Sequence, residues 1–263
     1  MTIPELLKKK SEGRKITMLT AYDYPFARMV DEAGIDMVLV GDSLSMVVQG
    51  RENTLSVTMD EMIYHTRMVK RGASGALLVG DMPYLSYQVS TEEAVRNAGR
   101  FIKEGGAHAV KIEGGSEAVS AVRAMTRAEI PVMAHIGLTP HAILRMGGWR
   151  LQGRSEEAAG RLLEDALALE EAGAFAVVIE AVPAELAGRI TERLGIPTIG
   201  IGAGPKVDGQ VLVLHDVLGL FERFRPRFAR RYADLREEGL RAIRAFREDV
   251  EQGRFPSEEE SFT

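Results

Sequence analysis

Two aspartates stand in similar surroundings, each after a glycine at the end of an apolar run. Asp42 lies in "VLVGDS" and Asp81 in "LLVGDM". Carboxylate oxygens are hard ligands, and Mg²⁺ is usually held by one or two of them together with substrate oxygens and water. The pair therefore predicts a magnesium site. Each aspartate alone would also suit the N-cap of a following helix, so a structural role stays open for each.

Lys111 and Glu113 are two residues apart in "VKIEGG", which places them on one face of a regular strand. In a functional site Lys111 would contact an anionic substrate. Glu113 would support the metal, through bound water, as carboxylates behind a metal often do. An interior ion pair without catalytic function is the alternative, because such pairs also occur in structural networks.

Two further side chains end apolar runs and could handle protons. Glu180 closes "FAVVIEAVP", and His135 ends the run in "VMAHIGLTPH". A carboxylate at the end of an apolar strand suits a general base, although it could simply reach solvent. His135 would orient the substrate or be a hydrogen-bonded core histidine. His141 and His215 are weaker candidates.

These residues must be positioned by short strands that alternate with amphipathic helices. Eight apolar runs alternate with amphipathic stretches, the pattern of βα units around a parallel sheet. The expected strands are Ile16–Ala21, Met37–Gly41, Ala76–Gly80, Ala109–Ile112, Val132–His135, Ala176–Glu180, Thr198–Ile201 and Val211–Leu214. The expected helices are Met59–Lys70, Thr91–Glu104, Ser116–Ala128, Ser155–Glu171, Ala184–Leu194 and a terminal helix over Arg227–Glu251.

The junctions between helices and strands repeat, as in "EAGID", "EGGAHAV", "EAGAFAV" and "RLGIP". Glycine suits the left-handed end of a helix, so the repeated junctions indicate one unit that recurs around a barrel. We expect a single (βα)8 TIM-barrel domain over residues 1–263 with extra terminal helices, although two doubly wound domains would give the same alternation. In a barrel the C-terminal strand ends share one rim, where the polar residues would meet.

The glycine run Gly200, Gly202 and Gly204 follows the seventh expected strand at that same rim. Such a run is typical of loops that accept phosphate at a helix N-terminus. Freedom of the backbone without any phosphate explains it equally.

Composition excludes several classes of protein. The 263 residues include 33 Lys and Arg against 38 Asp and Glu, a net charge of −5, and no cysteine. Thiolate chemistry and disulfides are excluded, and mild acidity argues against a nucleic-acid partner. No apolar run approaches 18 residues, and the first residues show no signal-peptide core. We expect a cytoplasmic protein with no membrane partner.

The sequence resembles the ketopantoate hydroxymethyltransferase family along nearly its whole length. The resemblance rests on "MLTAYDYPFA" at Met18–Ala27, "VGDSLSMVVQG" at Val40–Gly50, "GDMPYLSY" at Gly80–Tyr87, "VKIEGG" at Val110–Gly115, "AHIGLTPH" at Ala134–His141, "LQGR" at Leu151–Arg154, "VIEAVP" at Val178–Pro183, "IGIGAGPKVDGQVLVLHDVLGL" at Ile199–Leu220 and "FPSEEESF" at Phe255–Phe262. Trp149 departs from it, because the family usually has tyrosine there.

The resemblance implies a barrel of the phosphoenolpyruvate/pyruvate superfamily type, assembled as a homodecamer. It implies Mg²⁺ and transfer of a hydroxymethyl group from 5,10-methylenetetrahydrofolate to 3-methyl-2-oxobutanoate, giving 2-dehydropantoate for pantothenate and coenzyme A. By residue, it implies Asp42 and Asp81 as metal ligands that also contact the substrate, and Glu113 as a further metal-associated carboxylate. Ser43 and Lys111 become substrate contacts and Glu180 the proton acceptor. His135 is a candidate accessory group on the strength of its position at a strand end alone.

Three other classes compete with this interpretation. A C–C lyase of the same superfamily generally needs a cysteine, which this chain lacks. A barrel kept only for binding or assembly would have lost part of the acidic cluster. A phosphosugar isomerase would use the glycine loop for phosphate but would leave Asp42 and Asp81 unexplained.

Overall fold

The computed structural model describes residues 1–148, 150–223 and 226–262, so Trp149 lies outside the described residues. Eight parallel strands close into a barrel in sequence order, and β8 pairs with β1. The predicted barrel is confirmed. Its strands are β1 Ile16–Thr20, β2 Met37–Val40, β3 Leu77–Asp81, β4 Ala109–Glu113, β5 Val132–Gly137, β6 Ala176–Glu180, β7 Thr198–Ile201 and β8 Gly209–Leu212.

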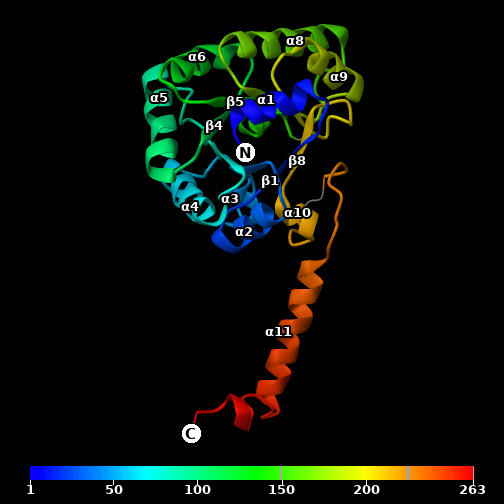
Figure 1. Cartoon of the computed structure of the whole chain (residues 1–263). Helices are drawn as coiled ribbons and strands as arrows, with labels where there is room; N and C mark the ends of the chain where they lie inside the picture. Colours follow the sequence, from blue (N-terminus) through cyan, green and yellow to red (C-terminus); the bar gives the residue numbers. More distant parts are fainter. Residues whose placement is uncertain (149, 224–225, 263) are drawn as a thin grey trace. The chain divides into compact units, whose positions relative to one another are not determined.

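Helices surround the barrel, as Figure 1 shows. Following the chain, they are α2 Tyr24–Glu32, α4 Met59–Gly72, α5 Thr91–Arg100, α6 Val119–Arg127, α8 Glu156–Glu171 and α9 Ala184–Arg193. Four of them begin at a Ser, Thr or Asp whose side chain accepts a hydrogen bond from the first turn. Short helices α3 Leu44–Val47, η3 Pro140–Ala142 and α7 Ile143–Met146 follow β2 and β5 at the C-terminal rim.

The structure corrects the predicted pattern in three places. Residues 202–208, all described, join β7 to β8 without a helix, so the seventh unit lacks its α component. The predicted helix Thr91–Glu104 changes to a π-helix, η1, at Phe101–Gly105. β8 starts at Gly209, two residues before the predicted Val211, because the backbone of β8 is already paired with Ile16 at that residue.

The inward-facing residues of all eight strands form one apolar core. Because side chains alternate along a strand, every second residue points inward. The strand members of this core are Ile16, Met18, Met37, Leu39, Leu77, Val79, Ala109, Met133, Ala176, Val178, Ile199 and Val211. The core fills the barrel, so the barrel is a packed scaffold rather than a channel.

Helix α1, Ile3–Ser11, lies against the N-terminal end of this barrel. Its Leu6 is fully buried in the apolar core. Two lysines of its last turn pair with aspartates that precede strands, Lys9 with Asp36 at 2.5 Å and Lys10 with Asp208 at 2.7 Å. This end of the barrel is therefore covered.

The chain divides into two compact units, Met1–Val213 with the barrel and Leu214–Thr263. The described part of the second unit contains α10 Leu214–Leu218, α11 Leu235–Glu251 and η4 Glu258–Glu260. The predicted terminal helix from Arg227 is wrong for its first eight residues: the N–H groups of Tyr232 and Ala233 donate to Val217 instead of to a helical turn. The single domain over 1–263 stays a prediction.

Within the described ranges, we find no helix with the length and apolar character needed to cross a membrane.

Candidate active site

The polar residues of the site continue the inward-facing series of the barrel core. On β4, Ala109 belongs to the core, and Lys111 and Glu113 follow at steps of two residues. The same step leads from core to site on three other strands: Val79 to Asp81, Met133 to His135 and Val178 to Glu180. Side-chain alternation therefore brings the predicted residues together at the C-terminal rim.

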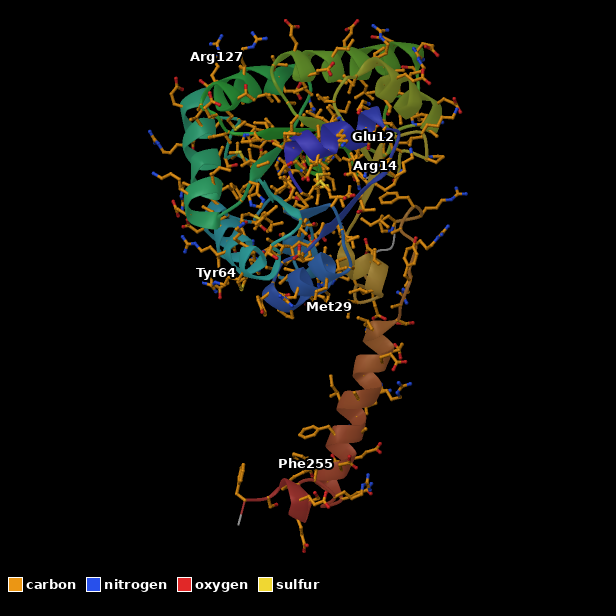
Figure 2. The ribbon with its side chains drawn as sticks, in the orientation of Figure 1. Glu12, Arg14, Met29, Tyr64, Arg127 and Phe255 are labelled. Carbon is orange, nitrogen blue, oxygen red and sulfur yellow. The ribbon has the colours of Figure 1, made fainter. Side chains whose placement is uncertain are left out.

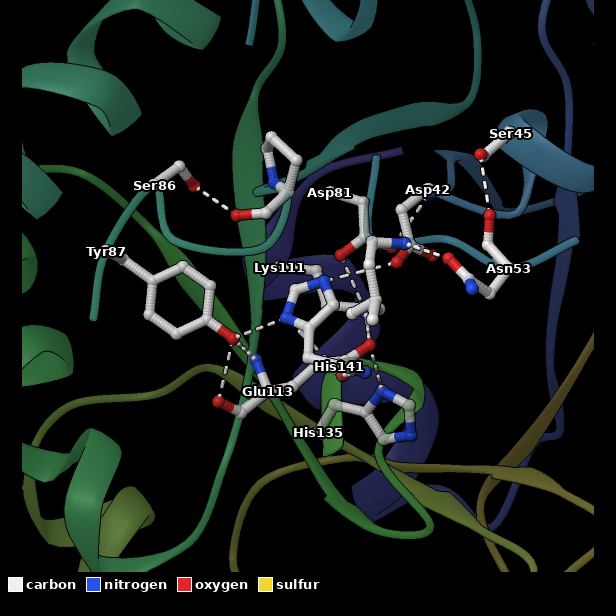
Figure 3. Close-up of polar contacts among 12 residues, drawn as sticks. Asp42, Ser45, Asn53, Asp81, Ser86, Tyr87, Lys111, Glu113, His135 and His141 are labelled. Carbon is white, nitrogen blue, oxygen red and sulfur yellow. Dashed lines mark hydrogen bonds and ion pairs between the residues drawn. The ribbon is translucent and has the colours of Figure 1, made fainter. Parts of the chain in front are cut away.

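Lys111 lies at the centre of a buried charge network (Figure 3). Its Nζ is 2.6 Å from Asp81 Oδ1 and 3.3 Å from Glu113 Oε1. Strand pairing sets Asp81 directly beside Lys111. Burial raises the pKa of Asp81 to about 7, with Asp42 and Glu113 adding to the rise and Lys111 opposing it. The interior ion pair between Lys111 and Glu113, one of the two alternatives from the sequence, is present, and Asp81 also pairs with Lys111.

His135 stands between two carboxylates. Its Nε2 is 3.2 Å from Glu180 Oε2, and its Nδ1 is 3.5 Å from Glu113 Oε1. Burial and the positive charge of Lys111 lower the pKa of His135, but its contacts with Glu113 and Glu180 outweigh them and raise it to about 9. Glu180 is only 8% exposed, so it does not reach freely into solvent.

Glu113 has three basic neighbours, Lys111, His135 and His141. Burial opposes its ionisation, but Lys111, His141 and His135 together lower the pKa of Glu113. The Oε2 atom accepts a hydrogen bond from the His141 backbone N–H at 3.0 Å. Glu113 is thus an ionised carboxylate that ties β4 to the loop after β5.

Asp42 lies in the loop between β2 and α3, and its backbone N–H donates to Asp81 Oδ2 at 3.2 Å. Its Oδ2 is buried and has no hydrogen-bond partner among the described residues. Neither aspartate caps a helix: α3 has Ser43 as its N-cap without a side-chain bond, and α5 is capped by Ser90. The alternative role of Asp42 and Asp81 as helix N-caps is therefore wrong.

Residues without a predicted role complete the site. Tyr87 donates its hydroxyl to the Glu113 carbonyl at 2.9 Å and lies 3.1 Å from His141 Nδ1. The Tyr22 hydroxyl is 2.8 Å from Ser43 Oγ, which positions this predicted substrate contact. Both tyrosines lie in loops within the quoted family segments, but no spacing rule links them to the strand ends. His215 lies in α10, in the other unit.

The glycine run after β7 has a backbone explanation. Gly202 and Gly204 have φ values of 63° and 76°, in the left-handed region. A Cβ on Gly204 would lie 2.4 Å from Ala184 Cβ of α9. Glycine is needed here for conformation and close packing, whether or not a phosphate binds.

Asp42, Glu113 and His141 each offer one ligand atom, and these atoms lie within 4.8 Å of one another. All three side chains are buried. The group could therefore hold a metal ion, because oxygen and imidazole ligands suit divalent cations. Asp81, the other predicted ligand, is not in this group, and both its oxygens already accept hydrogen bonds from Lys111 and Asp42. Its role as a ligand stays a prediction.

Comparisons with known proteins agree with this geometry. The family model of ketopantoate hydroxymethyltransferase matches residues 1–258. The 3-methyl-2-oxobutanoate hydroxymethyltransferase of Pelobacter propionicus is 61% identical over 100% of this chain and 97% of its own length. The protein of that name from Moorella thermoacetica is 58% identical over 100% and 97%.

Solved structures share the barrel at much lower identity. A phosphonopyruvate hydrolase in complex with oxalate and Mg²⁺ has a TM-score of 0.62 at 16% identity, covering 99% of this chain and 93% of its own. A 2,3-dimethylmalate lyase of the PEP mutase/isocitrate lyase superfamily has a TM-score of 0.61 at 17% identity, covering 100% and 92%. These structures have the same barrel fold as this chain. With the model matching nearly the whole length and relatives near 60% identity, the chain belongs to the ketopantoate hydroxymethyltransferase family.

Proposed function

We propose that this hydroxymethyltransferase forms an enolate of 3-methyl-2-oxobutanoate at the rim described above. The enolate takes a hydroxymethyl group from 5,10-methylenetetrahydrofolate and becomes 2-dehydropantoate (ketopantoate), for pantothenate and coenzyme A biosynthesis. Family membership and the activity of the relatives support the reaction. The group of buried carboxylates around Lys111, His135 and His141 supports the location of the reaction at this rim.

The residues present fit a divalent cation. The Asp42 Oδ2 and His141 Nε2 atoms are buried and stand 3.2 Å apart, and neither has a hydrogen bond within the described part of the chain. Burying such atoms without partners is costly, and a cation would satisfy both. Asp42, Asp81 and Glu113 would hold Mg²⁺. When bound, Mg²⁺ would act as a Lewis acid that stabilises the negative charge of an enolate.

Glu180 is the proton acceptor in this account. It removes the proton from carbon 3 of the oxo acid, which leaves the enolate. His135 Nε2, 3.2 Å from Glu180 Oε2, fixes the direction in which that carboxylate points. The base is thereby held in one position before the substrate arrives, and general bases act most efficiently when so positioned.

Lys111 and Ser43 bind the substrate in this account. Lys111 supplies positive charge where the enolate becomes negative, and its two carboxylate partners hold Nζ in place. Ser43 is held by Tyr22 beside Asp42. Carbon 3 then attacks the methylene carbon of the folate, and water supplies the hydroxyl group when the folate nitrogen leaves.

The test is a transfer reaction followed by NMR. The chain, 3-methyl-2-oxobutanoate, 5,10-methylenetetrahydrofolate and Mg²⁺ should give 2-dehydropantoate and tetrahydrofolate in equal amounts. Omitting either substrate should give no product. Consumption of the oxo acid without folate, or no product under any of these conditions, would overturn the proposed reaction.

Location and assembly extend the same proposal. We place the reaction in the cytoplasm, with small molecules rather than nucleic acid or membranes as partners. A homodecamer is the assembly that the family resemblance implies.

A further inference from the structure

His141 is a buried side chain that the reaction described above does not use. It belongs to η3, the short helix after β5, and is 8% exposed. Its backbone N–H is fixed by Glu113 Oε2 at 3.0 Å. Its ring lies between Tyr87 on one side and Asp42 on the other (Figure 3).

The contacts of Tyr87 define which ring nitrogen of His141 carries a proton. The Tyr87 hydroxyl donates to the Glu113 carbonyl at 2.9 Å and accepts from the Glu113 N–H at 3.0 Å. With its hydrogen used, this oxygen can only accept from His141 Nδ1, which is 3.1 Å away. Two further atoms lie farther from Nδ1: Gln88 Nε2 at 3.5 Å and Glu113 Oε2, an acceptor, at 3.6 Å. The tautomer with the proton on Nδ1 satisfies all of these groups except the distant amide.

That tautomer leaves an electron pair on Nε2, aimed at an anion. Nε2 is 3.2 Å from Asp42 Oδ2, and neither atom has a hydrogen bond among the described residues. Two buried acceptors that face each other repel unless a cation binds both. An imidazole held through its other nitrogen is the usual arrangement of a metal-bound histidine.

We propose that His141 Nε2 is a metal ligand, together with Asp42 and Glu113, and that the site therefore binds a divalent first-row transition ion more tightly than Mg²⁺. Imidazole favours such ions, whereas Mg²⁺ favours oxygen ligands alone. Tyr87 is the positioning residue, because it fixes the ring and its tautomer. The inference rests on the metal site of the proposed function, but it requires no substrate.

Metal titration of the metal-free full chain tests the proposal. Calorimetry with CoCl₂ and with MgCl₂, and the visible absorption of bound Co²⁺, should show Co²⁺ binding about 100-fold or more tighter than Mg²⁺. His141→Gln should lower Co²⁺ affinity by about 10- to 100-fold and change the Co²⁺ spectrum. It should change Mg²⁺ affinity by less than about 3-fold, because Mg²⁺ gains little from imidazole.

Two further variants complete the design. Tyr87→Phe keeps the ligand but removes the partner of Nδ1, so Co²⁺ affinity should fall about 10-fold even if His141→Gln folds poorly. His108→Gln is the matched histidine control: His108 directly precedes β4, at the opposite end of the barrel from His141, and its Nδ1 accepts from Leu78 N–H. This control should bind both ions like the unchanged chain.

An unchanged Co²⁺ affinity in His141→Gln, or equal losses for both ions, would overturn the proposal. A histidine that only pairs with Asp42 competes with the cation, so its removal would strengthen binding of both ions, which would also overturn it. Co²⁺ binding through His141 without ketopantoate formation would refute the proposed function and leave this inference standing. If ketopantoate forms but Co²⁺ binding does not depend on His141, the proposed function stands and this inference is refuted.

Discussion

His135 is held between Glu113 and Glu180, and its charge decides what it can do. Its pKa is raised to about 9 because the two carboxylates outweigh burial and the positive charge of Lys111. At neutral pH the ring is then an imidazolium, a donor at both nitrogens. An imidazolium cannot accept a proton from the substrate. This supports the proposed role of Glu180 as the base, with His135 directing it.

We predict that His135→Gln lowers kcat by about 10- to 100-fold while KM for the oxo acid changes less than about 3-fold. Glutamine lacks the charge and the two-sided geometry, so Glu180 loses its fixed orientation while the substrate contacts remain. Steady-state kinetics measure both constants, and a thermal melt checks the fold. Unchanged kcat would make His135 a core histidine only.

At the scale of elements, Gly137 allows β5 and β6 to approach each other beside the base. Its φ is 92°, and an added Cβ would lie 2.2 Å from the Glu180 carbonyl oxygen. A side chain there is strained and also collides with backbone that cannot rotate away. The position of Glu180 thus depends on a glycine in the neighbouring strand.

Gly137→Ala should lower the free energy of unfolding by about 2 kcal/mol or more and reduce kcat, since β6 must move at Glu180. Denaturant unfolding and kinetics test both effects. Gly160→Ala in α8 is the control, because no described atom beyond its chain neighbours and its own helix backbone lies within 4 Å of the added Cβ. It should leave activity unchanged and raise stability by up to about 1 kcal/mol. If the two substitutions change stability and kcat equally, the position of Glu180 does not depend on Gly137.

Asp36 connects α1 to the start of the barrel. It accepts hydrogen bonds from Lys9 Nζ and from both the N–H and hydroxyl of Thr17. Burial opposes ionisation of Asp36, but the bonds from Lys9 and Thr17 outweigh it and hold the pKa below its usual value of 3.8. A lowered carboxyl pKa stabilises the fold above that value, and the contribution is lost as the pH falls through the folded-state pKa.

We predict that Asp36→Asn costs about 2 kcal/mol of unfolding free energy at pH 7, because it leaves Lys9 without its carboxylate. The difference from the unchanged chain should shrink as the pH falls below 3.8. Urea unfolding across this range measures it. Asp60→Asn is the control: Asp60 pairs with Arg100 at the surface, so the expected change is under about 0.5 kcal/mol. If the difference in unfolding free energy does not change with pH, the lowered pKa of Asp36 is not its cause.

Periodicity predicted the residues that lie on strands, because alternation and the barrel rim place them without knowledge of any contact. Asp81, Lys111, Glu113, His135 and Glu180 are all of this kind. His141 lies in a loop, where no period relates it to a strand, so only its three-dimensional position beside Asp42 shows its importance. Similarly, amphipathic spacing predicted α11 but not its start at Leu235, which depends on the backbone bonds to Val217.

At the scale of the barrel unit, the two ends of the barrel differ in chemistry. α1 and its lysine–aspartate pairs cover the N-terminal end, and an apolar core fills the middle. Apart from Asp36 at the N-terminal end, the buried charges of the described residues gather at the C-terminal end, where loops and short helices surround them. In the proposed reaction the substrates would therefore reach the site from the C-terminal rim.

The outer faces of neighbouring helices carry exposed apolar side chains. Met29 on α2 is 52% exposed and Tyr64 on α4 is 62% exposed (Figure 2). Buried in an interface between copies, such side chains would add to the stability of an assembly. Light scattering during gel filtration should give a mass ten times that of one chain, and Met29→Arg with Tyr64→Arg should lower it. A monomer would contradict the proposed homodecamer.

Enolate formation by Glu180 is tested by proton exchange at carbon 3 of 3-methyl-2-oxobutanoate in heavy water. The exchange is followed by NMR without folate. The unchanged chain should exchange this proton when the metal is present and stop when a chelator removes it. Glu180→Gln should still bind the oxo acid, but its rate of proton exchange should fall by about 100-fold or more. Exchange at the normal rate in Glu180→Gln, or none in the unchanged chain with metal, would contradict enolate formation by Glu180 at this site.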